Sequence, residues 1–166
     1  MYIQCTQKLL AKLDQPHEKL TNPPDSKYCW HASFFEHFGM VFVAIVNDCS
    51  GHELFVEVDS FQNFSSGLLQ ELERDMIDLG LSNEEVSSYF THAGPLMFGP
   101  TGERAQIARL NGFTRRLKDF AVNTISFLEE MQAKAEKEGV PLDFDELEQN
   151  SPSYKGNPKP KLSPAK

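Results

Sequence analysis

Four polar side chains near residue 110 have the types and spacing to bind an anion. If residues 101–137 form a helix, with successive side chains about 100° apart, all four project within about 40° of one direction. They are Arg104, Asn111, Arg115 and Lys118. A guanidinium offers a fork of donors that fits a phosphate or a carboxylate. The alternative is an ordinary solvated helix face, where basic residues are common.

Trp30 and His31, at the start of an apolar β-rich stretch, are the second candidate pair. An indole beside a titratable imidazole can form a ring-stacking pocket that contains a general base. Neighbouring residues of a strand point to opposite faces of the sheet, however. The alternative therefore places Trp30 in the core and His31 on the other face, with no catalytic role for either.

The cysteines and histidines do not form a metal-binding pattern. The chain has three cysteines, an odd number, and they are widely spaced without a CxxC pair: Cys5, Cys29 and Cys49. This pattern indicates reduced, partly buried thiols. His37 and His52 lie near turns without an accompanying carboxylate pattern. The chain also lacks a P-loop, GxGxxG, GxSxG and HExxH. We expect no metal and no cofactor, and whether the protein is an enzyme stays open.

The elements that must position these residues begin with a three-stranded unit in residues 30–58. Residues 41–46 are a continuous apolar run rich in β-branched side chains, which is typical of a buried strand. A turn at Gly39 precedes this run and a dense turn cluster at 47–51 follows it. Residues 53–58 partly alternate polar with apolar. We expect three antiparallel strands, with the middle one buried on both faces.

Shorter elements flank this unit. Residues 2–5 read as a short strand that pairs with one of the sheet's edges, and residues 7–13 as a short helix. Ser65 and Ser66 are expected to cap a helix whose apolar positions, at helical spacing, run from Leu68 to Leu79 and which ends at Gly80. A second short helix is expected over 86–91, after a capping start at Ser82–Glu85. Residues 14–27 and 93–100 are rich in proline and read as loops, the second one packed down.

The long C-terminal helix starts at Thr101 or Gly102 and runs to about Lys137, where Gly139 and Pro141 end it. The predicted fold class is α+β: a small antiparallel sheet of three or four strands packed against two or three helices. Residues 1–150 would form this single domain. Residues 151–166, with four prolines and four lysines, would form a disordered basic tail.

The charge is unevenly distributed along the chain. The net charge is −8, yet residues 1–150 hold 12 basic against 24 acidic residues. Such a body repels nucleic-acid phosphates, which argues against direct nucleic-acid binding. The acidic charge fits equally a protein partner with a basic surface or nothing more than solubility. No apolar run is long enough for a membrane helix and the N-terminus lacks a signal-peptide pattern. We expect a cytoplasmic protein without a membrane segment.

Three segments resemble a family of small bacterial proteins of unknown function. Residues 1–10, MYIQCTQKLL, are similar to that family's opening strand with its threonine, lysine and leucine pair. Residues 30–35, WHASFF, resemble its Trp-His-Ala segment before an aliphatic strand that ends in asparagine, here Asn47. Residues 104–112, RAQIARLNG, resemble its arginine-to-asparagine helix start.

The resemblance spans about residues 1–120 and implies no reaction, cofactor or partner. It adds Asn47 to the ligand-binding candidates Trp30, His31, Arg104, Asn111 and Arg115. The chain departs from the family pattern at three positions, with Ser33 for asparagine, Ala108 for glycine and Gly112 for aspartate.

The leading hypothesis is a non-enzymatic binding or regulatory module for a protein partner or a small anionic ligand, from a bacterial mobile element or phage. The rival is a small enzyme acting on a phosphoester or nucleotide, with His31 as acid/base and Arg104 and Arg115 on the phosphate. That rival requires His31 to stand in a pocket within reach of the arginines. A third hypothesis, an acidic mimic of nucleic acid, requires residues 71–75 and 143–148 to form one patch. Nothing in the sequence fixes the oligomeric state.

Overall fold

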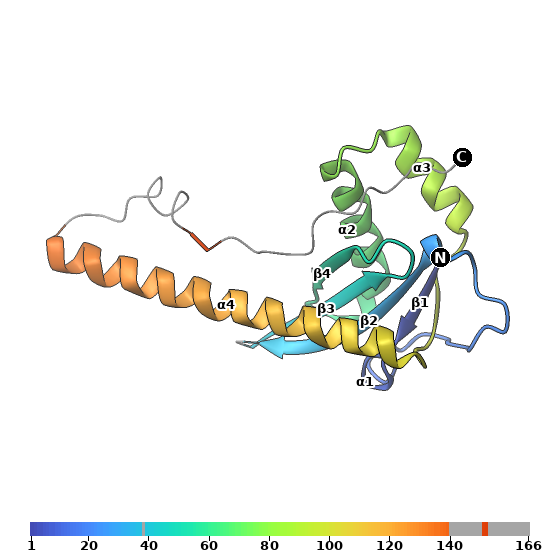
Figure 1. Ribbon diagram of the computed structural model, residues 1–166, viewed down its shortest axis with the longest axis horizontal. Coiled ribbons are helices and arrows are strands. Elements are labelled where there is room, and N and C mark those ends of the chain that lie inside the picture. Colours follow the sequence, from blue (N-terminus) through green and yellow to red (C-terminus); the bar gives the residue numbers. More distant parts are fainter. Residues whose placement is uncertain (38, 140–150, 153–166) are drawn as a thin grey trace. The chain divides into compact units, whose positions relative to one another are not determined.

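The computed structural model describes residues 1–37, 39–139 and 151–152, which contain a five-stranded sheet and four α-helices (Figure 1). Short 3-10 turns occur at Ser26–Tyr28 and Phe61–Asn63. In chain order the main elements are β1 (Tyr2–Cys5), α1 (Gln7–Leu10), β2 (Cys29–His37), β3 (Met40–Asn47), β4 (Glu53–Glu57), α2 (Phe64–Asp78), α3 (Asn83–Ala93), β5 (Met97–Pro100) and α4 (Arg104–Glu138).

The sheet is mixed, with the strand order β4-β3-β2-β1-β5. The antiparallel unit β2–β3–β4 is confirmed, and β1 pairs with its β2 edge as expected. The prediction of an antiparallel sheet with three or four strands was wrong, because β1 runs parallel to both β2 and β5. The fifth strand lies within residues 93–100, which the sequence indicated as a loop. Its proline, Pro100, is tolerated there because the strand is at the sheet's edge.

The chain divides into two compact units. Residues 1–113 contain the five strands of the described sheet, the first three helices and the start of α4, while the described residues from Thr114 onward belong to the second unit. Within the second unit, the described residues up to 139 are the remainder of α4 and the turn after it. Residues 140–150 and 153–166, which include the acidic segment 143–148 and most of the predicted basic tail, lie outside the described residues.

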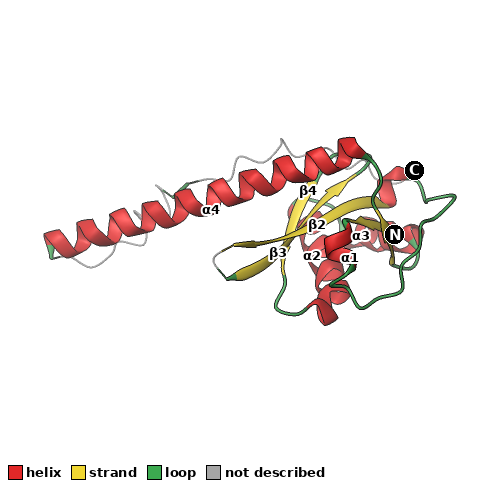
Figure 2. Cartoon of the chain, turned by 90° about the horizontal axis from the view of Figure 1, so that it is seen from below, coloured by secondary structure: helices red, strands yellow, loops and turns green. Residues whose placement is uncertain are grey.

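The hydrophobic core of the first unit lies between one face of the sheet and α2. Buried side chains on that face include Ile3, Trp30, Val43 and Ile45. Helix α2 covers them with residues at the predicted helical spacing (Figures 1 and 2). Its buried residues are Phe64, Leu68, Leu72 and Met76. Gly80, directly after this helix, has the positive φ of 93° expected of a helix-ending glycine.

Helix α3 starts with the predicted cap but extends further than residues 86–91. The Ser82 hydroxyl accepts from the Glu85 backbone N–H, and the Glu85 carboxylate accepts from the Ser82 N–H. The Ser82 N–H and hydroxyl both donate to the Glu85 carboxylate, and these two bonds lower the pKa of Glu85. Helix α4 confirms the long helix, beginning at Arg104 rather than at residue 101 or 102. None of the described helices is both long and apolar enough to span a membrane.

Candidate ligand-binding pocket

Trp30 is a core residue, since its side chain is fully buried on the α2 face of the sheet. Its Nε1 donates to the Tyr89 hydroxyl at 3.2 Å, and that hydroxyl donates to the Lys27 carbonyl at 2.9 Å. Burial raises the pKa of Tyr89. The indole therefore anchors α3 to the sheet. This placement agrees with the alternative interpretation, in which Trp30 packs in the core.

His31 lies on the opposite face of the sheet and has no exposed surface. Its Nδ1 is 2.8 Å from the Thr101 hydroxyl, and its Nε2 is 2.9 Å from one Asp48 oxygen. The other Asp48 oxygen accepts from Gln4 Nε2 at 3.2 Å. The linked side chains of Gln4, Asp48, His31 and Thr101 connect β1, β2, the β3–β4 turn and the segment before α4. Such a hydrogen-bonded chain can fix the position of a proton on the imidazole. A fully buried imidazole, however, presents no atom to a substrate.

Asn47, 1% exposed, organises the turn that follows β3. Its Nδ2 donates to the backbone carbonyls of Lys27 and Cys29 at 3.0 and 3.2 Å. Its Oδ1 accepts from the backbone N–H groups of Cys49 and Ser50 and from the Ser50 hydroxyl. The side-chain amide is thus occupied by bonds within the protein, which leaves it no free group for a ligand.

The predicted anion-binding face consists of exposed or partly exposed side chains of α4. Arg104 and Asn111 are exposed residues of α4 in the first unit. Among the described residues, no hydrogen bond or ion pair joins either of them to His31. Arg115, also exposed, belongs to the second unit. The candidates therefore separate into buried structural groups and exposed side chains of α4.

A second histidine–carboxylate pair was not anticipated from the sequence. His52 Nε2 lies 2.5 Å from an Asp75 oxygen, and its ring meets Trp30 edge-on at 6.2 Å between centroids. This pair ties the β3–β4 turn to α2. Within the described ranges, no group of three or more histidine, cysteine or acidic side chains is placed to hold a metal ion.

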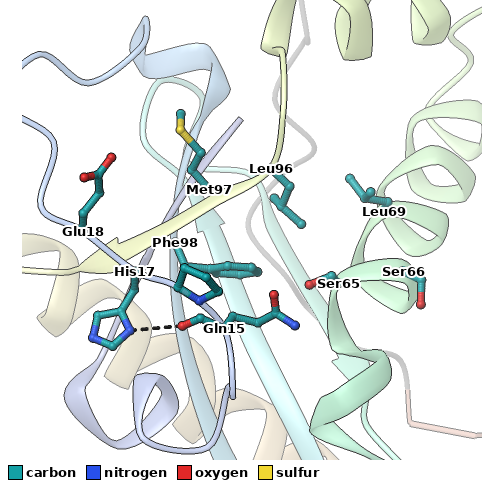
Figure 3. A pocket seen from close by; sticks show the side chains of 10 residues that line it. Gln15, His17, Glu18, Ser65, Ser66, Leu69, Leu96, Met97 and Phe98 are labelled. Atoms are coloured by element: carbon teal, nitrogen blue, oxygen red, sulfur yellow. Dashed lines mark hydrogen bonds between the residues drawn. The ribbon is translucent and has the colours of Figure 1, made fainter.

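A pocket of about 770 Å³ opens beside the edge strand β5, on the α2 side of the sheet (Figure 3). Three segments far apart in sequence line it: the loop after α1, the start of α2, and β5 with the residue before it. In Figure 3, Leu69 and Leu96 face each other across the opening, and the Phe98 ring forms the floor. The lining residues are Gln15, Pro16, His17, Glu18, Ser65, Ser66, Leu69, Leu96, Met97 and Phe98.

The wall formed by residues 15–18 is fixed to β5. His17 makes an isolated parallel bridge with Phe98, and the Glu18 N–H donates to the Phe98 carbonyl at 3.0 Å. The Tyr2 hydroxyl donates to the Glu18 carbonyl at 3.0 Å. The Tyr2 hydroxyl and the Glu18 carbonyl both lie against the Cα of Gly99. A Cβ at residue 99 would collide with the Tyr2 ring and hydroxyl and with the Glu18 carbonyl. The missing side chain of Gly99 therefore makes this wall possible.

Polar groups of the pocket remain available to a ligand. In the described part of the chain, neither the Ser65 hydroxyl nor the Gln15 amide has a hydrogen-bond partner. His17 Nδ1 lies 3.3 Å from the Gln15 carbonyl, so in the neutral ring this nitrogen carries the proton and Nε2 is an acceptor. The first turn of α2 contains no acidic residue, so its dipole favours a negative charge there, and among the described residues that line the pocket Glu18 is the one acidic side chain.

The comparisons with known proteins give a family and no assigned activity. Neither a curated protein nor a solved structure matches the chain significantly. One family model matches residues 2–150, which includes every residue of the pocket and all six candidate residues from the sequence. This match agrees with the resemblance to a family of unknown function. The chain belongs to the family described as Domain of unknown function (DUF6933).

Proposed function

We propose that the protein is a non-enzymatic binding module that holds a small amphipathic molecule in the pocket beside β5. The observation that carries this proposal is the pocket itself, which combines apolar lining residues with polar groups that have no hydrogen-bond partner among the described residues. Ligand pockets in proteins typically combine a mostly apolar lining with a few convergent polar groups. The volume of about 770 Å³ lies within the range of such sites.

The pocket's chemistry suits a ligand with an apolar body and one anionic end. Leu69, Leu96 and Phe98 offer apolar surface for the body. The Ser65 hydroxyl, at the start of α2, donates a hydrogen bond toward the anionic end. The positive end of the α2 dipole favours a negative charge at the same place. This ligand shares only its negative charge with the small anionic molecule expected from the sequence, since the described lining of the pocket contains none of the six candidate residues.

The geometry gives less support to the two rival functions. An enzyme using His31 requires that imidazole in a pocket, but it is fully buried and absent from the pocket lining. The nucleic-acid mimic requires residues 71–75 and 143–148 to form one patch, and 143–148 lie outside the described residues. Neither rival has an observation that favours it over the pocket.

The test uses 1-anilinonaphthalene-8-sulfonate, whose aromatic body and single sulfonate match the proposed ligand class. We expect saturable 1:1 binding to the wild-type protein. Ser65→Phe places a ring inside the pocket and should weaken binding by about tenfold or more, equivalent to about 1.4 kcal/mol. Gln70→Phe is the matched control, because Gln70 is exposed on the same helix and lies outside the lining.

A second probe isolates the anionic end. N-phenyl-1-naphthylamine has nearly the same aromatic body without the sulfonate, so it should bind the same pocket more weakly. Equal loss of binding in Ser65→Phe and Gln70→Phe would show that the dye does not occupy the pocket, and would refute the proposal. Equal affinity for the two dyes would refute the proposal that the ligand has an anionic end. The proposal that the pocket binds an apolar molecule would then remain.

A further inference from the structure

The two edges of the sheet differ in how far they are closed. At one end, β5 is bridged by residues 16–18 through the His17–Phe98 pairing. At the other end, β4 pairs with β3, and within the described ranges no strand adjoins its outer side. An open strand edge is a ready template for pairing with another extended segment.

The hydrogen bonds flanking β4 establish which of its residues face the open side. The Asn47 N–H donates to the His52 carbonyl, and the Val58 N–H donates to the Val41 carbonyl. Residues 52, 54, 56 and 58 thus direct their backbone groups toward β3, since successive residues of an antiparallel strand alternate. Phe55 and Glu57 consequently direct their N–H and C=O groups outward.

The side chains of these two residues share one face of the sheet and are accessible. Phe55 is 44% exposed, and Glu57 is exposed. The Phe55 ring meets the Phe42 ring edge-on at 6.2 Å, which holds it beside the strand. In an added antiparallel strand, the residues opposite Phe55 and Glu57 would be direct cross-strand neighbours on this same face.

A second copy of this chain does not suit the edge. Antiparallel self-pairing centred on Phe55 would place Glu53 of each copy opposite Glu57 of the other, and like charges directly opposite are destabilising. The excess of acidic over basic residues in residues 1–150 adds long-range repulsion between copies. The negative charge of Glu57 and the acidic excess of residues 1–150 attract a basic segment rather than a second copy of this chain.

We propose that β4 binds an extended basic segment of another protein as an additional antiparallel strand. That segment would carry a basic residue opposite Glu57 and an apolar residue, two positions away, opposite Phe55. Backbone bonds to the outward groups of Phe55 and Glu57 supply affinity, while the two side-chain pairs supply selectivity. This interaction is independent of the pocket, since β4 and β5 are the opposite ends of the sheet.

The test is a phage-display selection, in which a library of random nine-residue peptides is screened for binding to the immobilised full-length protein. We expect enrichment of peptides with a basic residue two positions from an apolar one. The affinity of the most enriched peptide is then measured for wild type and variants by fluorescence anisotropy. Glu57→Lys should weaken binding by about tenfold, because attraction becomes repulsion. Phe55→Pro, which removes an outward N–H, should weaken it further.

Glu73→Lys is the matched control, because it makes the same charge change at an exposed position of α2. It should change the peptide affinity by less than about twofold. Failure to enrich the basic–apolar pattern would overturn the proposal, as would equal weakening by Glu57→Lys and Glu73→Lys. A wild-type dimer in sedimentation that Phe55→Pro dissociates would also overturn it, because a second copy would then occupy the edge.

Discussion

At the scale of single residues, the three most suggestive side chains in the sequence are held inside the protein. Trp30, His31 and Asn47 are each 1% exposed or less and each bonds to a neighbouring segment. Strand alternation was enough to predict that Trp30 and His31 face opposite sides. The sequence could not show that both faces are buried, because their bonding partners are distant in sequence, at Tyr89 and Thr101.

Asn47→Asp should destabilise the protein by about 1–3 kcal/mol, because a carboxylate cannot donate to the carbonyls of Lys27 and Cys29. The measurement is urea unfolding followed by circular dichroism. Asn111→Asp makes the same change at an exposed position and should stay within about 0.5 kcal/mol of wild type. Equal stability of the two variants would contradict the structural role of Asn47.

The three thiols should differ sharply in reactivity. Cys5 and Cys29 are buried and Cys49 is exposed, so iodoacetamide at pH 8 should label Cys49 first. Burial raises the pKa of Cys5, and burial together with the Asp48 charge raises the pKa of Cys29 to about 11. Peptide mapping by mass spectrometry gives the order. Rapid labelling of Cys29 in the folded protein would contradict this account.

The Cys29 shift also predicts a pH dependence. Its pKa is higher in the folded protein than the ordinary value of 9.0, so the unfolded chain loses this proton first as pH rises. The contribution of the protonated Cys29 thiol to the free energy of unfolding is complete below pH 9.0, and it is lost as the pH rises toward about 11. Wild type should therefore lose more stability over this range than Cys29→Ala. Parallel pH profiles in urea unfolding would contradict the sign.

At the scale of elements, local patterns in the sequence were sufficient for most helices and for the central strands. The α3 cap, the α2 apolar spacing and the length of α4 followed from periodicity and capping residues. Strand β5 was missed because it has four residues, ends in Pro100 and pairs in parallel with the distant β1. The pocket was missed with it, since its walls meet only through that pairing.

Gly99→Ala tests how the pocket wall is built. The new Cβ would overlap Tyr2 and the Glu18 carbonyl, so we expect a loss of about 1–3 kcal/mol in urea unfolding, as for overpacked sites. Gly67→Ala is the control, because that glycine lies in α2 with open space around its Cβ position. It should stabilise the protein by about 0.5–1 kcal/mol. Equal effects of the two changes would show that the wall tolerates a side chain at residue 99.

At the scale of the whole molecule, the first unit carries two opposite sheet edges with different surroundings. The β5 edge is partly closed and bears the pocket, whereas β4 is flanked by acids and has no further strand beside it among the described residues. The acidic balance of residues 1–150, evident from the sequence, supplies the charge complementarity for the proposed basic partner. Which edge forms a pocket was not predictable, because it depends on the strand order rather than on any local pattern.

The most direct test of the central claim is native mass spectrometry of the protein purified gently from its natural host. A pocket that binds a small amphipathic molecule predicts a non-covalent mass increase of a few hundred daltons, the size of ligand that such a volume holds. This increase should persist in Gln70→Phe and disappear in Ser65→Phe. A ligand retained equally by both variants, or a bare wild-type protein under conditions that preserve bound molecules, would contradict the account.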